Sequence, residues 1–297
     1  MIKGKSLAPG AFQTAGFVSK LQQVGYKVNE VDALPDGPRT WTFGASSQPN
    51  GGRNEEANVE VNHEVKKAVC GVVDGDLATF PIVVGGECNI CPAIMSALWE
   101  RLAPKRVGLM YVDGDADLTI PGEPGSSGNL ASMTFTHMAM VEGALESMKP
   151  FARPDGSGVV NNSNVVIFGL NAGLQSNTRD QIGYLLNEGY RVFTSAAIAR
   201  DQESRAKQAI QYLEERVDHI LVHFDVDAID GVGFPLANVI NRTGVGFDEA
   251  MAAMRVFLRS KKVCGIVIAE VNPDHDPDLE MTSKLINALV DGLREEI

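Results

Sequence analysis

The sequence has little of what defines several large classes of protein. It has four cysteines in 297 residues, too few for the disulfide framework of a small secreted scaffold. Its 26 Lys and Arg residues are outnumbered by 38 Asp and Glu residues, which gives a formal charge of −12. A broad basic surface for nucleic acid is therefore not expected. The longest apolar runs are only as long as β-strands, so no membrane span is expected either.

The remaining composition is that of an ordinary globular protein, with 44% hydrophobic and 22% charged residues. The first ten residues, MIKGKSLAPG, lack the apolar stretch of a secretory signal. Together with the few cysteines, this predicts a cytoplasmic protein. No repeat or linker divides the chain, so we expect one domain over residues 1–297.

Short runs rich in Val, Ile and Leu alternate with amphipathic segments along the chain. The expected strands cover residues 80–84, 107–112, 165–170, 191–194, 219–226 and 263–269. The expected helices cover residues 58–73, 92–102, 130–148, 179–188, 206–217, 247–259 and 281–297. This alternation predicts an α/β fold of three layers, α/β/α, with a central and mostly parallel sheet.

Acidic residues gather where three of the expected strands end. Asp113, Asp115 and Asp117 follow the strand at 107–112, and Asp225 and Asp227 lie at the end of the strand at 219–226. Glu87 and Cys88 follow the strand at 80–84. Residues two apart in an extended chain point to the same side, and ligands of open α/β sheets bind outside the carboxyl ends of the strands. We therefore expect these side chains to meet in one crevice.

Five carboxylates in one crevice repel one another, and a divalent cation relieves that repulsion. A single Asp at a strand end more often caps a helix or shapes a turn. Two clusters on separate strands instead favour a metal centre, and five carboxylates suit two hard cations such as Mn²⁺ or Mg²⁺. Such a pair can lower the pKa of a bound water and present hydroxide to an electrophilic carbon.

With these motifs the chain resembles the ureohydrolase superfamily, which includes arginases, agmatinases and formiminoglutamases. Family signatures of the types GGDH, DAHxD, SxDxDxxDP and EVNP correspond here to GGEC at 85–88, DGDAD at 113–117, HFDVDAIDG at 223–231 and EVNP at 270–273. SSGNL at 126–130 resembles the arginase loop that holds the amino-acid end of the substrate. Order and spacing match from about residue 80 to the C-terminus.

The resemblance implies an arginase-like fold and a centre of two divalent cations, with manganese favoured. One cation would be held by Cys88, Asp113, Asp117 and Asp225, and the other by Asp113, Asp115, Asp225 and Asp227. Asp117 would orient the metal-bound hydroxide, and Glu270 would receive the guanidinium or amidine group. Ser127 and Asn129 would grip the substrate. Many members are trimers or hexamers, so the resemblance is also compatible with a homo-oligomer.

The departures from the family bear on the chemistry. The family usually has His where this chain has Cys88 and Asp115; N-hydroxyarginine amidinohydrolases resemble it in having Cys at the first position. Five carboxylates and a thiolate carry six negative charges against four positive charges of two cations, so a bound water should be less acidic. The thiolate leaves Zn²⁺ and Fe²⁺ open as alternatives.

Residues expected to serve free L-arginine are missing. Ala131 stands where arginases have a proton-shuttling His, and residues 169–174 read GLNAGL where the family has acidic groups for the α-amino group. His223 shares the face of Asp225 and would orient a carboxylate or replace the proton carrier; a buried His bonded to backbone is the simpler alternative.

Two functional hypotheses remain. The first is a binuclear metal hydrolase that cleaves a C–N bond of a small guanidino or amidine compound other than free L-arginine by metal-bound hydroxide, releasing urea or a urea derivative. The second is a catalytically silent arginase-like protein, retained as a metal-binding or assembly subunit. Retention of five aspartates at the ligand positions favours the hydrolase.

Overall fold

Six parallel strands form the central sheet of the computed structural model, which describes residues 3–39 and 51–294. The strands are β1 (Ile82–Val84), β2 (Val107–Val112), β3 (Val165–Leu170), β4 (Arg191–Thr194), β5 (His219–Asp225) and β6 (Val263–Ala269). Their order across the sheet is β1-β6-β5-β2-β3-β4, and every neighbouring pair is parallel. The expected α/β fold is confirmed.

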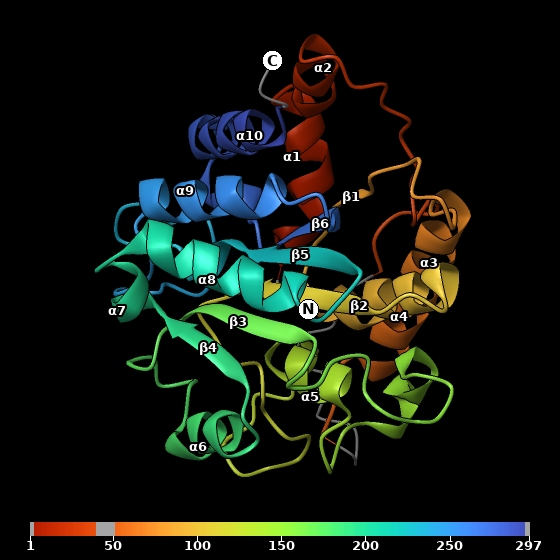
Figure 1. Ribbon diagram of the computed structural model, residues 1–297, viewed down its shortest axis with the longest axis vertical. Helices are drawn as coiled ribbons and strands as arrows, with labels where there is room; N and C mark the ends of the chain where they lie inside the picture. Colours follow the sequence, from red (N-terminus) through yellow and green to blue (C-terminus); the bar gives the residue numbers. More distant parts are fainter. Residues whose placement is uncertain (1–2, 40–50, 295–297) are drawn as a thin grey trace.

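Helices cover both faces of this sheet (Figure 1). One face carries α1 (Ala8–Thr14), α2 (Phe17–Gln23), α8 (Gln202–Glu214), α9 (Phe247–Leu258) and α10 (Glu280–Leu293). The other carries α3 (Glu55–Val72), α4 (Cys91–Leu102) and α5 (Thr134–Ala139). The short helices α6 (Arg179–Asn187) and α7 (Ser195–Ile198) contact β4 at the sheet edge.

Alternate residues of the buried strands enter two separate hydrophobic cores, as the two-residue period of a strand requires. In β2, Met110 and Val112 pack with α8 to α10, whereas Leu109 and Tyr111 pack with α3 and α4. Because Asp113 follows with the parity of Leu109 and Tyr111, the acidic ends of the strands belong to the α3–α4 side.

The expected helix at 130–148 is wrong. The structure has a 3₁₀ turn at Leu130–Met133, then α5, then a second 3₁₀ segment at Glu146–Phe151. Met140 has a left-handed backbone with φ +50°, and Gly143 has φ +92°, so no helix can continue through them. Most apolar side chains of the 130–148 segment are buried in the core although the segment is not one helix.

The other expected elements differ mainly at their ends. The strand expected at 80–84 begins two residues later, and the helix expected at 206–217 begins four residues earlier. α1, α2 and α7 had no counterpart among the expected elements. The last helix ends at Leu293, and residues 295–297 of its expected range lie outside the described residues. In the part of the chain that the structure describes, no helix has the length and apolarity to cross a membrane.

Candidate metal centre

Three neighbouring strands at the middle of the sheet end side by side. Val112 of β2 pairs with Phe224 of β5, and Asp225 of β5 pairs with Ala269 of β6. Asp113 comes directly after β2 and Glu270 directly after β6. These two residues therefore lie on either side of Asp225. Residues far apart in the sequence meet here because parallel strands end at one edge of the sheet.

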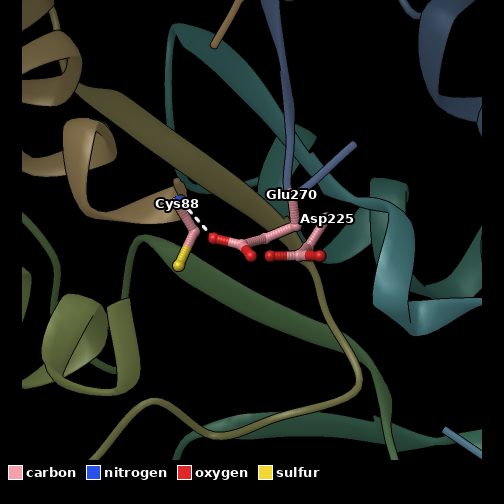
Figure 2. Close-up of side chains that lie close together, drawn as sticks. All are labelled: Cys88, Asp225 and Glu270. Atoms are coloured by element: carbon pink, nitrogen blue, oxygen red, sulfur yellow. Dashed lines mark hydrogen bonds between the residues drawn. The ribbon is translucent and has the colours of Figure 1, made fainter. Parts of the chain in front are cut away.

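Cys88 reaches the same point from a 3₁₀ turn, Cys88–Ile90, at the start of α4. Its backbone N–H donates to Glu270 Oε1 at 2.9 Å. Possible ligand atoms of Cys88, Asp225 and Glu270 all lie within 4.8 Å of one another, and all three residues are buried. Figure 2 shows the thiol and the two carboxylates gathered where the strands end.

Three further aspartates, Asp115, Asp117 and Asp227, lie in the segments that follow β2 and β5 and belong to the same cluster. Asp117, with a left-handed backbone at φ +49°, has an Oδ2 that accepts from Tyr111 Oη at 2.6 Å and from Cys88 Sγ at 3.5 Å. Asp227 Oδ1 accepts from the Gly114 N–H at 3.2 Å. Asp115 is partly buried, and its carboxylate accepts from the hydroxyl of Ser176.

Most of these groups are buried, so their charges act strongly on one another. Burial first, and then the neighbouring carboxylates, raise the pKa values of Asp113, Asp117 and Asp225 well above their ordinary range. The same causes raise the pKa of Asp227 to about 8. Burial and nearby carboxylates also raise the pKa of the Cys88 thiol. Such mutual repulsion is what a bound cation relieves.

All six predicted metal ligands thus lie in one cluster, by these hydrogen bonds and electrostatic interactions. Cys88, Asp113, Asp117, Asp225 and Asp227 are buried, and Asp115 is at the partly exposed edge. Glu270, which the family resemblance placed at the substrate, also lies among them. Its backbone is left-handed with φ +64°, an unfavourable conformation for a residue with a side chain.

Sequence reasoning missed a buried cation beside the cluster. Lys5 is 1% exposed, its ammonium forms a salt bridge with Glu270, and it lies 3.4 Å from Glu87 Oε1. Burial alone would lower the pKa of Lys5, but the carboxylates of Glu270 and Glu87 together outweigh it and raise that pKa, so the side chain is an ammonium. Gly4 (φ +100°) brings the chain close, since a Cβ there would lie 2.1 Å from Asn272 Oδ1. No sequence signal marked Lys5, because lysine is almost always exposed.

His223 lies under the cluster within β5 and is 0% exposed. Its ring stacks on Tyr111 with centroids 4.8 Å apart and 11° between planes. Burial lowers the pKa of His223 to about 3, so the imidazole is neutral. The backbone partner expected for a buried His is not there: neither ring nitrogen has a hydrogen-bond partner among the described residues.

The expected substrate loop approaches the cluster at its C-terminal end. Ser127 is exposed, and its Oγ accepts from the backbone N–H of Asn129 at 3.1 Å. Two residues after Asn129, the carbonyl oxygen of Ala131 lies 3.4 Å from Cys88 Sγ. The loop therefore leads from the surface to the buried cluster, with Ser127 at its outer end.

Comparisons with known proteins give one consistent result. Residues 3–293 match the arginase family. The chain is 25% identical to an arginase of Bacillus caldovelox, over 98% of this chain and 92% of that protein, and 27% identical to an arginase of Staphylococcus aureus, over 92% and 86%. The crystal structure of an arginase from Bacillus cereus superposes with a TM-score of 0.83 at 22% identity, covering 100% of this chain and 94% of that one. With the family matched over nearly its whole length, the chain belongs to the arginase family.

Proposed function

We propose that this protein is a binuclear metal-dependent hydrolase that cleaves a C–N bond of a small guanidino or amidine compound. The product would be urea or a urea derivative. The observation that supports this best is the convergence of Cys88, which follows β1, with five aspartates at the carboxyl ends of β2 and β5, nearly all of them buried. A protein that had abandoned the chemistry would gain stability by replacing such mutually repelling carboxylates.

The residues present fit divalent cations. Asp113 Oδ2 is buried and has no hydrogen-bond partner in the described part of the chain, so one lone-pair face of this carboxylate is left for a cation. The donors are oxygens and one sulfur, and carboxylate-rich donor sets suit Mn²⁺. We infer that manganese is the natural metal. The thiol keeps Zn²⁺ and Fe²⁺ as alternatives, because soft sulfur donors favour them.

Two groups of residues would hold the two cations. The first group is Cys88, Asp113, Asp117 and Asp225, and the second is Asp113, Asp115, Asp225 and Asp227. When bound, such cations supply Lewis acidity that makes water nucleophilic at neutral pH. Asp117, held by the Tyr111 hydroxyl, would accept the proton of that water and orient it toward the reacting carbon. Glu270 would hold the amidine nitrogens if Lys5 leaves its carboxylate.

The substrate would differ from free L-arginine. Asn171, at the segment where the family has acidic groups for an α-amino group, uses its side chain inside the protein: Nδ2 donates to Asn241 at 2.6 Å and to Thr243 at 2.9 Å. Ala131 offers no proton carrier. We therefore expect purified, Mn²⁺-loaded protein to release urea from L-arginine far more slowly than an arginase does, and an arginase-like rate would contradict this.

One observation favours the second candidate, a catalytically silent family member. The carboxylate that should receive the substrate cation is already paired with the ammonium of Lys5, and both groups are buried. A guanidinium would have to displace a buried charge of the same sign. The protein would then bind metal without turning over a guanidino substrate.

The deciding experiment measures metal content by mass spectrometry and urea release from a panel of guanidino and amidine compounds. Wild type, Asp225→Asn, Lys5→Met and the exposed control Asp248→Asn are loaded with Mn²⁺ in parallel. If the protein is a hydrolase, wild type and Asp248→Asn should hold about two metals per chain and release urea. Asp225→Asn should lose the metals. Metal without urea in wild type would favour the silent protein, and urea from Lys5→Met alone would identify Lys5 as the reason. A wild type that stays metal-free would exclude the hydrolase.

A further inference from the structure

The imidazole of His223 is a polar group placed where nothing in the described protein satisfies it. A neutral imidazole carries one N–H donor and one acceptor nitrogen. Both nitrogens of His223 are buried without a partner among residues 3–39 and 51–294, and the residue is 0% exposed. Each buried polar group left without a partner lowers the stability of the folded state. An apolar side chain of similar size would avoid that cost. An imidazole at this position is therefore best explained by a ligand that binds one of its nitrogens.

The groups within its reach are themselves acceptors. One ring nitrogen of His223 and carboxylate oxygens of Asp113 and Asp225 all lie within 4.8 Å of one another. Asp113 Oδ2 also lacks a hydrogen-bond partner in the described chain. A nitrogen lone pair and two buried carboxylates that lie this close together form a set of donors for a cation.

The surrounding fold fixes the ring in this position. His223 shares the side of β5 that carries Asp225, two residues later, and Tyr111 shares the side of β2 that carries Asp113. The stacked Tyr111 ring holds the imidazole plane, and the Tyr111 hydroxyl is engaged by Asp117 Oδ2 at 2.6 Å. Tyr111 therefore holds the ring without using its nitrogens.

We propose that His223 is a metal ligand, which supplies a nitrogen donor from β5 to the cation held by Asp113 and Asp225. The chain has lost the imidazoles usual at the positions of Cys88 and Asp115, and this one comes from beneath the cluster instead. It adds no negative charge to a site that already holds five aspartates. The inference rests on the proposed function only in requiring a bound divalent cation, and it does not require hydrolysis.

A direct test is pulsed electron paramagnetic resonance of the full chain loaded with Mn²⁺, grown with ¹⁵N-labelled histidine. Every other donor proposed for the centre is oxygen or sulfur, so a strong ¹⁵N coupling identifies a bound imidazole. The test compares wild type with His223→Leu and with the control His137→Leu. His137 is also buried, with an Nε2 that lacks a partner in the described part of the chain, but it belongs to neither ligand group.

We expect ¹⁵N coupling in wild type and His137→Leu and none in His223→Leu. Mn²⁺ affinity of His223→Leu should fall by about tenfold or more, since even groups that only orient a ligand contribute 10–100-fold. The metal-free His223→Leu protein should unfold at the same temperature as wild type or above it, whereas a purely structural histidine would lower that temperature and leave affinity unchanged.

Two results would overturn the proposal, and they separate it from the proposed function. Wild type that binds Mn²⁺ without ¹⁵N coupling would exclude His223 as a ligand and leave the metal hydrolase standing. Wild type that binds no Mn²⁺ would exclude both. Should His223→Leu fail to fold, the wild-type spectrum alone still decides, and His223→Asn supplies the affinity comparison.

Discussion

Lys5 is a buried cation whose ammonium lies between the carboxylates of Glu270 and Glu87. The positive charge offsets part of the negative charge of the buried carboxylates around it. It also occupies the carboxylate that the family resemblance assigns to a substrate cation. At the scale of single residues, Lys5 thus stabilises the carboxylates of the metal-free cluster. It would also compete with a substrate cation for the carboxylate of Glu270.

Replacing Lys5 with Met should separate these two effects. Because two buried carboxylates lose their cation, the metal-free Lys5→Met protein should be less stable by about 3–5 kcal/mol. Mn²⁺ should raise its unfolding temperature more than it raises that of wild type, since the cluster becomes more negative. Lys207→Met, which removes an exposed ion pair with Glu203, should cost less than about 1 kcal/mol. Equal stability of Lys5→Met and wild type in urea unfolding would contradict the salt bridge.

His137 predicts a pH dependence away from the metal ligands. It is 3% exposed on α5, and burial lowers its pKa to about 4. In the unfolded state the pKa of His137 is near 6.5. Between pH 6.5 and 4 this side chain is therefore protonated in the unfolded state and neutral in the folded state. Stability from this group is complete above pH 6.5 and is lost as the pH falls.

Urea unfolding of wild type and His137→Leu across pH 4–7.5 measures this contribution. Relative to the variant, wild type should lose about 3 kcal/mol of unfolding free energy between pH 7 and 4. The difference cancels the titration of the carboxylates that both proteins share. A difference that stays constant with pH would show that the pKa of His137 is the same in the folded and unfolded states.

At the scale of elements, the acidic cluster lies where β2, β5 and β6 end. The neighbouring strand β3 packs against the end of β2 and supports its position. Gly169 in β3 has φ +110° at the point where the register with β4 shifts. A Cβ at Gly169 would lie 3.0 Å from the carbonyl oxygen of Asp113. The strand end that carries the first aspartate therefore depends on the absence of a side chain in its neighbour.

Gly169→Ala should disturb both stability and metal binding. The left-handed backbone costs about 1–3 kcal/mol with a side chain, and the contact would push the end of β2. Mn²⁺ affinity by calorimetry should fall together with the unfolding free energy. The control is Gly183→Ala in α6, where a Cβ meets nothing within 4 Å; it should stabilise by about 0.5–1 kcal/mol and leave affinity unchanged. Unchanged affinity in Gly169→Ala would contradict the supporting role of β3.

At the scale of the whole molecule, the two cores of the α/β/α fold support a centre that is unfavourable by itself. The net charge of −12 and the buried aspartates both oppose the compact state when no cation is bound. A cation that binds only the folded chain adds stability in proportion to the logarithm of its concentration. Binding of the proposed cations would thus be coupled to folding of the whole protein.

Mn²⁺ at 100 times its dissociation constant should add about 2.7 kcal/mol to stability, and a chelator should remove it. The unfolding temperature should therefore rise by several degrees in wild type and not in Asp225→Asn. Sodium chloride at equal ionic strength controls for screening of surface charge. The same rise in both proteins would place the metal effect outside the proposed centre.

The sequence alone determined the strands, their parallel fold class and the acidic residues at their ends. Those features follow from local patterns: runs of Val, Ile and Leu, and aspartates two residues apart. It also predicted that Cys88 and the five aspartates would lie close together, because parallel strands bring their carboxyl ends to one edge of the sheet. The helix predicted over 130–148 is wrong because its apolar composition does not reveal the left-handed backbone of Met140, and a single glycine, Gly143, was too weak a signal to end it.

Only the tertiary structure decided what those residues contact. That Lys5 is buried against Glu270, and that His223 is stacked on Tyr111 without a partner for its nitrogens, depends on chain segments more than a hundred residues apart. Burial and desolvation are properties of the packed molecule, and no spacing in the chain encodes them. The same physical reason separates the proposed ligands, which short motifs predict, from the charge balance and the burial of the site, which the whole fold sets.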